Sequence, residues 1–190
     1  MCGRYVLYSK EKFKKKFNIN ISQNYNISPN QKVFVIDHAK NVVKLKWGIK
    51  PKWKNSLIIN ARSETIGIKK SFAGLKRCVF VSDGYYEWRR RGKLKIPYYH
   101  YLPKKFLYFA GLCNNLGCVV VTMDSFKYLS EIHSRQPLFL KENQIDSWIK
   151  NDKSNIIFDE IVNFHQVSTE VNKTWCNSND LIIEIEEKNQ

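Results

Sequence analysis

The sequence lacks the features that mark membrane, secreted and repeat proteins. Its 190 residues contain no run of about eighteen apolar residues, the length that a membrane-spanning helix requires. The N-terminus has no charged stretch followed by an apolar one, so we expect no secretory signal peptide. No internal repeat, low-complexity segment or interdomain linker is evident. We therefore expect one domain over residues 1–190, long enough to bury a core of its own.

The cysteines do not form a disulfide framework or a metal motif. The five of them are Cys2, Cys78, Cys113, Cys118 and Cys176. An odd, irregularly spaced set is typical of a reducing compartment. Cys113 and Cys118 are close in sequence, but no histidine or second cysteine pair stands near them, and a structural zinc site needs four ligands. We expect no metal, no cofactor and a cytoplasmic protein, associated with the bacterial nucleoid when it acts, or a nuclear one in a eukaryote.

Acidic residues are scarce relative to basic ones. The chain has 17 Asp and Glu against 32 Lys and Arg, a formal net charge of +15 and a pI near 9.6. Such an excess favours binding to a polyanion such as nucleic acid. The richness in Lys, Asn and Ile also fits the codon bias of an AT-rich genome. Charge alone therefore leaves both interpretations open.

Short apolar or alternating segments dominate the pattern and predict β-strands. We expect strands over residues 33–36, 42–47, 57–60, 78–82, 85–88, 98–101, 106–112, 118–122, 137–140, 162–167 and 181–185. Helices are expected over residues 9–17, 125–133 and 141–150, and a loop over 24–31. Many short strands with few helices predict an α+β fold with mostly antiparallel strands in a barrel-like core and a few flanking helices.

The first residues could carry unusual chemistry. Removal of Met1, which is usual before a small second residue, would make Cys2 the N-terminal residue. A thiol and an α-amine on one residue, with ordinary pKa values of about 8.5 and about 7.7–8.0, both have a reactive fraction near neutral pH. An amine can form a Schiff base with an aldehyde, and the thiol can then close a thiazolidine ring. The alternative is a cysteine that simply follows the start codon.

Three further segments carry polar side chains in positions suited to a site. Asn60, Arg62 and Glu64 follow an apolar strand directly, where a scaffold presents functional groups. Glu87 stands among aromatic residues, and desolvation there would raise its pKa toward the range of a general acid or base. His133 could transfer protons near neutral pH. Each of these also has a structural reading, as a turn, a surface residue or a packed side chain.

Together these segments resemble a known family. The similar blocks run in family order over residues 2 to about 175, with 176–190 as a tail. They are Met1-Cys2-Gly3-Arg4-Tyr5, Tyr25-Asn26-Ile27-Ser28-Pro29, Trp47-Gly48-Ile49-Lys50-Pro51-Lys52-Trp53, Asn60-Ala61-Arg62-Ser63-Glu64-Thr65, Asp83-Gly84-Tyr85-Tyr86-Glu87-Trp88, Ala110-Gly111-Leu112, His133-Ser134-Arg135-Gln136-Pro137 and Val167-Ser168-Thr169-Glu170-Val171-Asn172. This set resembles the SRAP-domain family, the SOS response-associated peptidases that process abasic sites.

The resemblance implies a monomeric DNA-repair enzyme of the lyase class. It would sense abasic sites in single-stranded DNA and shield them by a covalent thiazolidine crosslink through Cys2 after Met1 removal, with self-processing peptidase activity. In this reading Asn60 orients Cys2 and the sugar, Glu87 is the general acid and base, and His133 moves a proton at the sugar oxygen. The implied DNA-binding residues are Arg4, Arg62 and Arg135 on phosphates and Trp47 and Trp88 on bases.

The chain also departs from the family pattern. Asn24 stands where the family usually has Arg, Ser134 where it has Asp, and Lys50 and Lys52 where residues are mostly neutral. These changes touch the grip on DNA and leave the four reactive positions intact. Two other functions stay open. One is an N-terminal-Cys peptidase or amidohydrolase, which would act on a peptide in trans. The other is a non-covalent binder of single-stranded nucleic acid, whose salt-sensitive binding would survive loss of Cys2.

Overall fold

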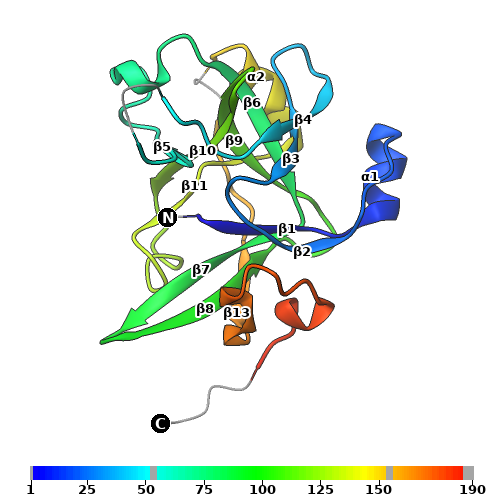
Figure 1. Cartoon of the computed structure of the whole chain (residues 1–190), viewed down its shortest axis with the longest axis vertical. Coiled ribbons are helices and arrows are strands. Elements are labelled where there is room, and N and C mark those ends of the chain that lie inside the picture. Colours follow the sequence, from blue (N-terminus) through cyan, green and yellow to red (C-terminus); the bar gives the residue numbers. More distant parts are fainter. Residues whose placement is uncertain (1, 52–54, 153–155, 186–190) are drawn as a thin grey trace.

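The computed structural model describes residues 2–51, 55–152 and 156–185. Its strands form two sheets, one above the other in Figure 1, with short helices at their edges. The mostly antiparallel α+β architecture that the sequence predicts is confirmed. The expected barrel-like closure is not, because within the described residues both sheets remain open. None of the helices in this part of the chain is long and apolar enough to cross a membrane.

The lower sheet in Figure 1 has five strands, and every neighbouring pair in it is antiparallel. In spatial order they are β13 (Asn163–Gln166), β8 (Leu94–Tyr101), β7 (Gly84–Arg91), β1 (Arg4–Leu7) and β2 (Asn24–Ile27). Strand β2 lies where we expected a loop, because pairing with β1 places Ile27 opposite Tyr5. The N-terminal strand is therefore held between neighbours on both sides.

The upper sheet has eight strands. Its main path is β11 (Arg135–Pro137), β10 (Gly117–Asp124), β9 (Leu107–Asn114), β6 (Lys76–Ser82), β3 (Lys32–Ile36) and β4 (Val42–Lys46). Two short strands join it at the side: β12 (Phe139–Leu140) pairs with β9, and β5 (Asn60–Arg62) runs parallel to β10. Strand β5 carries part of the predicted site.

Two α-helices and four short 3₁₀ helices complete the described chain. They are α1 (Lys10–Phe17), η1 (Lys70–Phe72), η2 (Glu142–Gln144), α2 (Ile145–Ile149), η3 (Thr169–Asn172) and η4 (Asn179–Ile182). Helix α1 buries Phe13 and ends at Asn18, whose φ of 55° is left-handed. The predicted helix over 125–133 is wrong. Residues 126–133 form short turns instead, in which the N–H of Ser130 bonds to the carbonyl of Phe126 and the N–H of His133 to the carbonyl of Leu129. Residues 181–185, predicted as a strand, begin inside η4.

The apolar core explains why β1 is fixed so firmly. Tyr5 packs edge-on against Trp47, Phe80 and Phe109, with ring centroids 5.4 to 6.2 Å apart. Its neighbour Val6 points the other way, into a second and smaller apolar cluster. A strand buried on both faces cannot slide without exposing one set of side chains. The residue that precedes it by two positions, Cys2, is consequently held in a defined place.

Candidate functional site

Cys2 and Asn60 meet although they lie 58 positions apart in the sequence. The side-chain amide of Asn60 donates a hydrogen bond of 2.9 Å to the carbonyl oxygen of Cys2. Asn60 reaches this place because β5 pairs in parallel with β10, which puts it opposite Val120. Cys2 itself is fully buried. The predicted association of these two residues is therefore present in the fold.

The negative charge of Glu87 affects the pKa of the Cys2 thiol. Burial raises the pKa of the Cys2 thiol, and the carboxylate of Glu87 raises it further. The same two causes, burial first and Glu87 second, raise the pKa of Tyr85, with a smaller effect from Cys2. Cys2, Tyr85 and Glu87 are all buried, and each lies within electrostatic reach of the other two. Our sequence reasoning gave Tyr85 no role, although alternation along β7 places it on the same face as Glu87.

His133 enters from the segment that precedes β11. It is half-buried, and its Nδ1 accepts a hydrogen bond of 2.9 Å from the backbone N–H of Arg135. An accepting Nδ1 leaves the proton of the neutral imidazole on Nε2. Strand β10 organises this part of the site, since it pairs with β5 through Val120–Thr122 and with β11 through Thr122–Asp124. The approach of His133 to the reacting atoms stays a prediction.

The predicted phosphate contact of Arg135 is contradicted. The residue is only 9% exposed. Its guanidinium donates to both carboxylate oxygens of Glu64 at 2.6 and 3.0 Å, to Asp124 at 2.5 Å and to the carbonyl of Thr122 at 2.8 Å. Glu64 and then Asp124 raise the pKa of Arg135. With both terminal nitrogens of its guanidinium bonded to the protein, Arg135 ties the end of β5 to β10 and β11.

The predicted stacking of Trp47 on a base is contradicted as well. Its side chain is fully buried, and its indole N–H donates to the carbonyl of Ile59 at 3.1 Å. Strand β4, which we predicted over residues 42–47, therefore leads directly into a side chain of the core. Trp53, its partner in the sequence block, lies outside the described residues.

Arg4 and Trp88 flank the site and both contact η3. The guanidinium of Arg4 donates to the side chain of Asn26 and to the carbonyl of Val171, each at 2.6 Å. The indole N–H of the half-buried Trp88 donates to the side chain of Asn172 at 2.9 Å. Arg62 is exposed at the end of β5. Of the five predicted DNA-binding residues, these three keep side chains near the surface.

Asn26 is a structural residue that our sequence reasoning quoted without assigning a role. It is buried, and its amide donates to the carbonyls of Val171, Lys173 and Cys176 at 2.9 to 3.3 Å. Three contacts to a segment some 150 positions away fix that segment against β1 and β2. The buried amide of Asn26 therefore holds in place the segment that Arg4 contacts.

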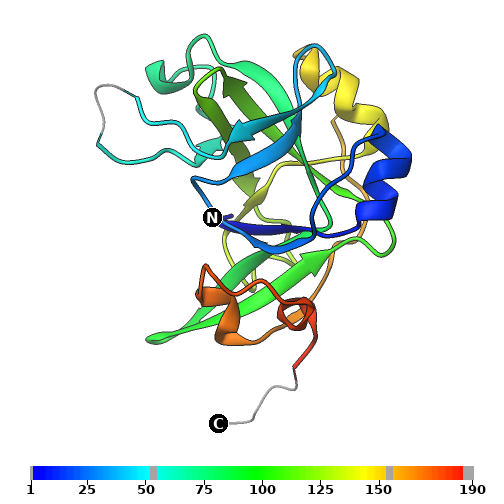
Figure 2. The same ribbon diagram turned by 45° about the vertical axis from the view of Figure 1, so that its right-hand side comes forward.

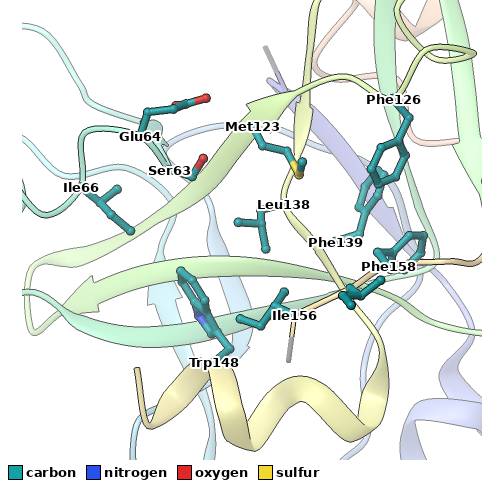
Figure 3. Close-up of a pocket in the computed structure, with 11 residues that line it drawn as sticks. Ser63, Glu64, Ile66, Met123, Phe126, Leu138, Phe139, Trp148, Ile156 and Phe158 are labelled. Carbon is teal, nitrogen blue, oxygen red and sulfur yellow. The ribbon is translucent and has the colours of Figure 1, made fainter. Parts of the chain in front are cut away.

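A cavity of about 500 Å³, shown in Figure 3, has a lining that includes none of Cys2, Asn60, Glu87 and His133. It touches the predicted site only through Ser63 and Glu64, which follow β5. The rest of its lining is apolar, with Phe126, Phe158 and Trp148 among the side chains that face it. Glu64, the acidic residue in the described lining of the cavity, is paired with Arg135. Among the described residues, no cluster of three or more His, Cys, Asp or Glu could hold a metal ion.

The fold and the site together define a class of protein. It is an α+β protein whose second residue, a buried cysteine, accepts a hydrogen bond from the amide of Asn60 and lies within electrostatic reach of a buried carboxylate. The family described as SOS response associated peptidase (SRAP) has a model that matches residues 1–174. The chain belongs to this family.

Named relatives agree with that assignment, and a solved structure agrees with the fold. The Bacillus subtilis protein named abasic site processing protein YoaM is 30% identical, over 96% of this chain and 97% of its own. Abasic site processing protein HMCES of Xenopus tropicalis is 30% identical, over 70% of this chain and 54% of its own. A crystal structure of a Bacteroides thetaiotaomicron protein, 21% identical, matches with a TM-score of 0.80 and covers 97% of this chain and 100% of that one. That last similarity supports the fold alone.

Proposed function

We propose that this protein captures abasic sites in single-stranded DNA by a covalent bond to Cys2, once Met1 has been removed. The observation that carries the proposal is the amide of Asn60 on the carbonyl of Cys2, with the carboxylate of Glu87 close enough to raise the pKa of the thiol. Membership of the SRAP family and the names of its relatives support the choice of substrate. Action on DNA fits a cytoplasmic or nuclear location.

The reaction balances without an added oxidant or cofactor. The α-amine of Cys2 attacks the aldehyde carbon of the ring-opened abasic sugar, and loss of one water gives an imine. The thiol then adds to the imine carbon and its proton passes to the nitrogen, which closes a five-membered thiazolidine. One carbon–nitrogen and one carbon–sulfur bond form, and the aldehyde oxygen leaves as water. The imine stage would also permit lyase chemistry on the DNA strand.

Each polar side chain of the site has a task in this scheme. Asn60 holds the backbone of Cys2, and its Oδ1, buried without a hydrogen-bond partner in the described chain, can accept from the amine or the sugar. Glu87 delivers a proton to the departing water and takes one from the thiol. His133 moves a proton at the sugar oxygen. These are roles for groups with suitable chemistry at the site.

Binding of the strand would use the surface residues of the same region. Arg62 and the Nη2 atom of Arg4 would contact phosphates, and Trp88 would stack on a base. Arg135 and Trp47, which are committed to the interior, take no part. We further propose a monomer, and release of Met1 as the protein's own peptidase step.

A denaturing gel tests the proposal. Purified protein is incubated with single-stranded DNA that carries one abasic site, and with intact DNA of the same sequence. A slow, heat-stable band for wild type with abasic DNA alone, lost in Cys2→Ala, is expected. Cys2→Ser should form no thiazolidine. Mass spectrometry establishes in parallel that Met1 is gone. No band from a correctly processed protein would overturn the proposal and leave the non-covalent binder as the better account.

A further inference from the structure

Strands β7 and β8 continue well beyond the sheet to which they belong. Strand β7 pairs with β1 only through Gly84–Tyr86, and β8 pairs with β13 only through Tyr98–Tyr101. Beyond these points β7 and β8 pair with each other as far as Arg91 and Leu94. In Figures 1 and 2 this hairpin projects away from the rest of the molecule. It forms a two-stranded ribbon that no third described strand covers.

The ribbon is strongly basic. Arg90, Arg91, Lys93 and Lys95 are all exposed, and the sequence has no acidic residue from position 88 to 105. Basic residues on an exposed strand edge also discourage pairing with other chains, which would account for some positive charge. Protection of the strand edge would not depend on which face of the ribbon carries each basic residue. The strand register shows which of these residues share a face with the proposed site.

One face of the ribbon continues from Glu87 and the other continues from Trp88. Directly opposed residues of an antiparallel pair share a face, and successive residues alternate between faces. The face that carries Glu87 therefore continues with Arg89 and Arg91, and Leu94, opposite Arg91, is 63% exposed. The contact of the Arg89 guanidinium with the ring of Tyr98, 5.1 Å from its centroid, agrees with this assignment. Arg90 and Lys95 lie on the opposite face, with Trp88.

We propose that the ribbon is a phosphate-binding arm whose Glu87 face, through Arg89 and Arg91, holds the DNA strand next to the abasic site. The inference rests on the proposed function and adds where one flanking strand runs. Arg4 and Trp88, on the other face of the sheet, would contact the strand on the other side of the lesion, where β7 leaves the sheet and not along the ribbon. At about 3.3 Å per residue, Arg91 lies about 13 Å along the strand from Glu87, the length of about four stacked nucleotides. Guanidinium groups bind phosphates without reading bases, so the grip is independent of sequence.

The register supplies a matched pair of variants. Arg91→Glu and Arg90→Glu make the same change of charge at adjacent exposed positions on opposite faces. Long-range electrostatics, with a screening length of about 8 Å at physiological salt, weakens binding in both. Only Arg91→Glu should remove a direct phosphate contact, and a charge-assisted contact of this kind is worth about tenfold in affinity. Arg90→Glu should cost no more than about twofold by the screened long-range effect.

Binding is measured in a Cys2→Ala background, so that no covalent bond forms. The probe is a fluorescein-labelled single strand with a central abasic site, followed by fluorescence anisotropy over a range of salt concentrations. Arg91→Glu should also reduce the slope of log affinity against log salt by about 0.7 for each phosphate that the variant no longer binds. Two shortened oligonucleotides identify the direction of the strand: one keeps a single nucleotide on the 5′ side of the abasic site, and the other keeps a single nucleotide on the 3′ side. On the oligonucleotide that lacks the nucleotides bound by the arm, Arg91→Glu should bind as tightly as the protein without this substitution.

The outcome separates the arm from the covalent chemistry. Equal decreases in affinity for Arg91→Glu and Arg90→Glu, or an Arg91→Glu effect that persists on both shortened strands, would overturn the proposal. With Cys2 restored, the Arg91→Glu effect should appear in the DNA concentration that gives half-maximal crosslinking. If wild type forms no crosslink, the proposed reaction fails, while the anisotropy comparison still decides whether the ribbon holds the strand.

Discussion

The environment of Cys2 favours one order for the steps of the proposed reaction. A thiol whose pKa is raised by burial and by a nearby carboxylate stays protonated at neutral pH. The thiolate is the nucleophilic form of cysteine, so this thiol reacts only when a base removes its proton. The α-amine of a processed chain, with an ordinary pKa of about 7.7–8.0, is then the first nucleophile. Amine attack followed by base-assisted ring closure matches the proposed sequence of steps.

Glu87→Gln tests how this residue acts on the thiol. Loss of the negative charge lowers the pKa of Cys2 relative to wild type, so the pH at which a small alkylating reagent modifies Cys2 should move downward. Crosslinking to abasic DNA should nevertheless become slower, by about 10²-fold or more, because the proton acceptor is lost. Peptide mass spectrometry follows alkylation, with the half-buried Cys176 as an internal reference. An unmoved alkylation profile would show that Glu87 does not influence the thiol.

The connection between β6 and β7 is one of the short links between the two sheets. The carboxylate of Asp83 accepts hydrogen bonds from the N–H groups of Tyr8 and Ser9 at 2.7 and 2.8 Å and pairs with Lys12 at 2.8 Å. The next residue, Gly84, opens the strand that carries Glu87. A side-chain carbon at Gly84 would lie 2.4 Å from the carbonyl oxygen of His100. The Asp-Gly pair is therefore a structural requirement for placing the site.

Gly84→Ala should destabilise the fold by about 3 kcal/mol or more, because the added methyl meets backbone that cannot move aside cheaply. Gly67→Ala is the matched control, since a side-chain carbon there meets nothing within 4 Å. It should change the free energy of unfolding by no more than about 0.5 kcal/mol. Urea unfolding of the three proteins measures both effects. Similar stabilities for the two variants would contradict the proposed tightness of this connection.

The stability of the whole molecule should depend on pH through one buried histidine. His100 is 1% exposed and stacks between Tyr85 and Phe164, with centroids 4.5 and 5.5 Å away. Burial lowers its pKa to about 3, with a smaller contribution from His165. The unfolded chain takes up this proton near its ordinary pKa of about 6.5. Between these two pH values only the unfolded state is protonated at His100, so stability falls as the pH falls.

His100→Phe removes this proton uptake and keeps an aromatic ring in the stack. The variant should lose less stability than wild type between pH 6 and pH 4, by up to about 1.4 kcal/mol for each pH unit. Urea unfolding at several pH values measures the slope, which is independent of any constant cost of the substitution. A slope identical to that of wild type would mean that His100 is already protonated in the folded state.

Much of the architecture could be predicted from local patterns. Alternation and apolar runs located most strands, because side chains on a strand face opposite directions in turn. The same patterns failed where a distant contact decided the outcome. Residues 24–27 form a strand since β1 lies beside them, and residues 126–133 form only short turns that lead into the pairing of β11 with β10.

The sequence by itself determined the family and the four predicted reactive residues, Cys2, Asn60, Glu87 and His133, because motif order and residue type are properties of the chain. Tertiary structure alone decided which of these groups meet and which side chains reach the surface. It joined Asn60 to Cys2 and buried Trp47 and Arg135, which residue type had suggested for DNA. Burial is set by packing between segments far apart in sequence, and no local pattern contains that information.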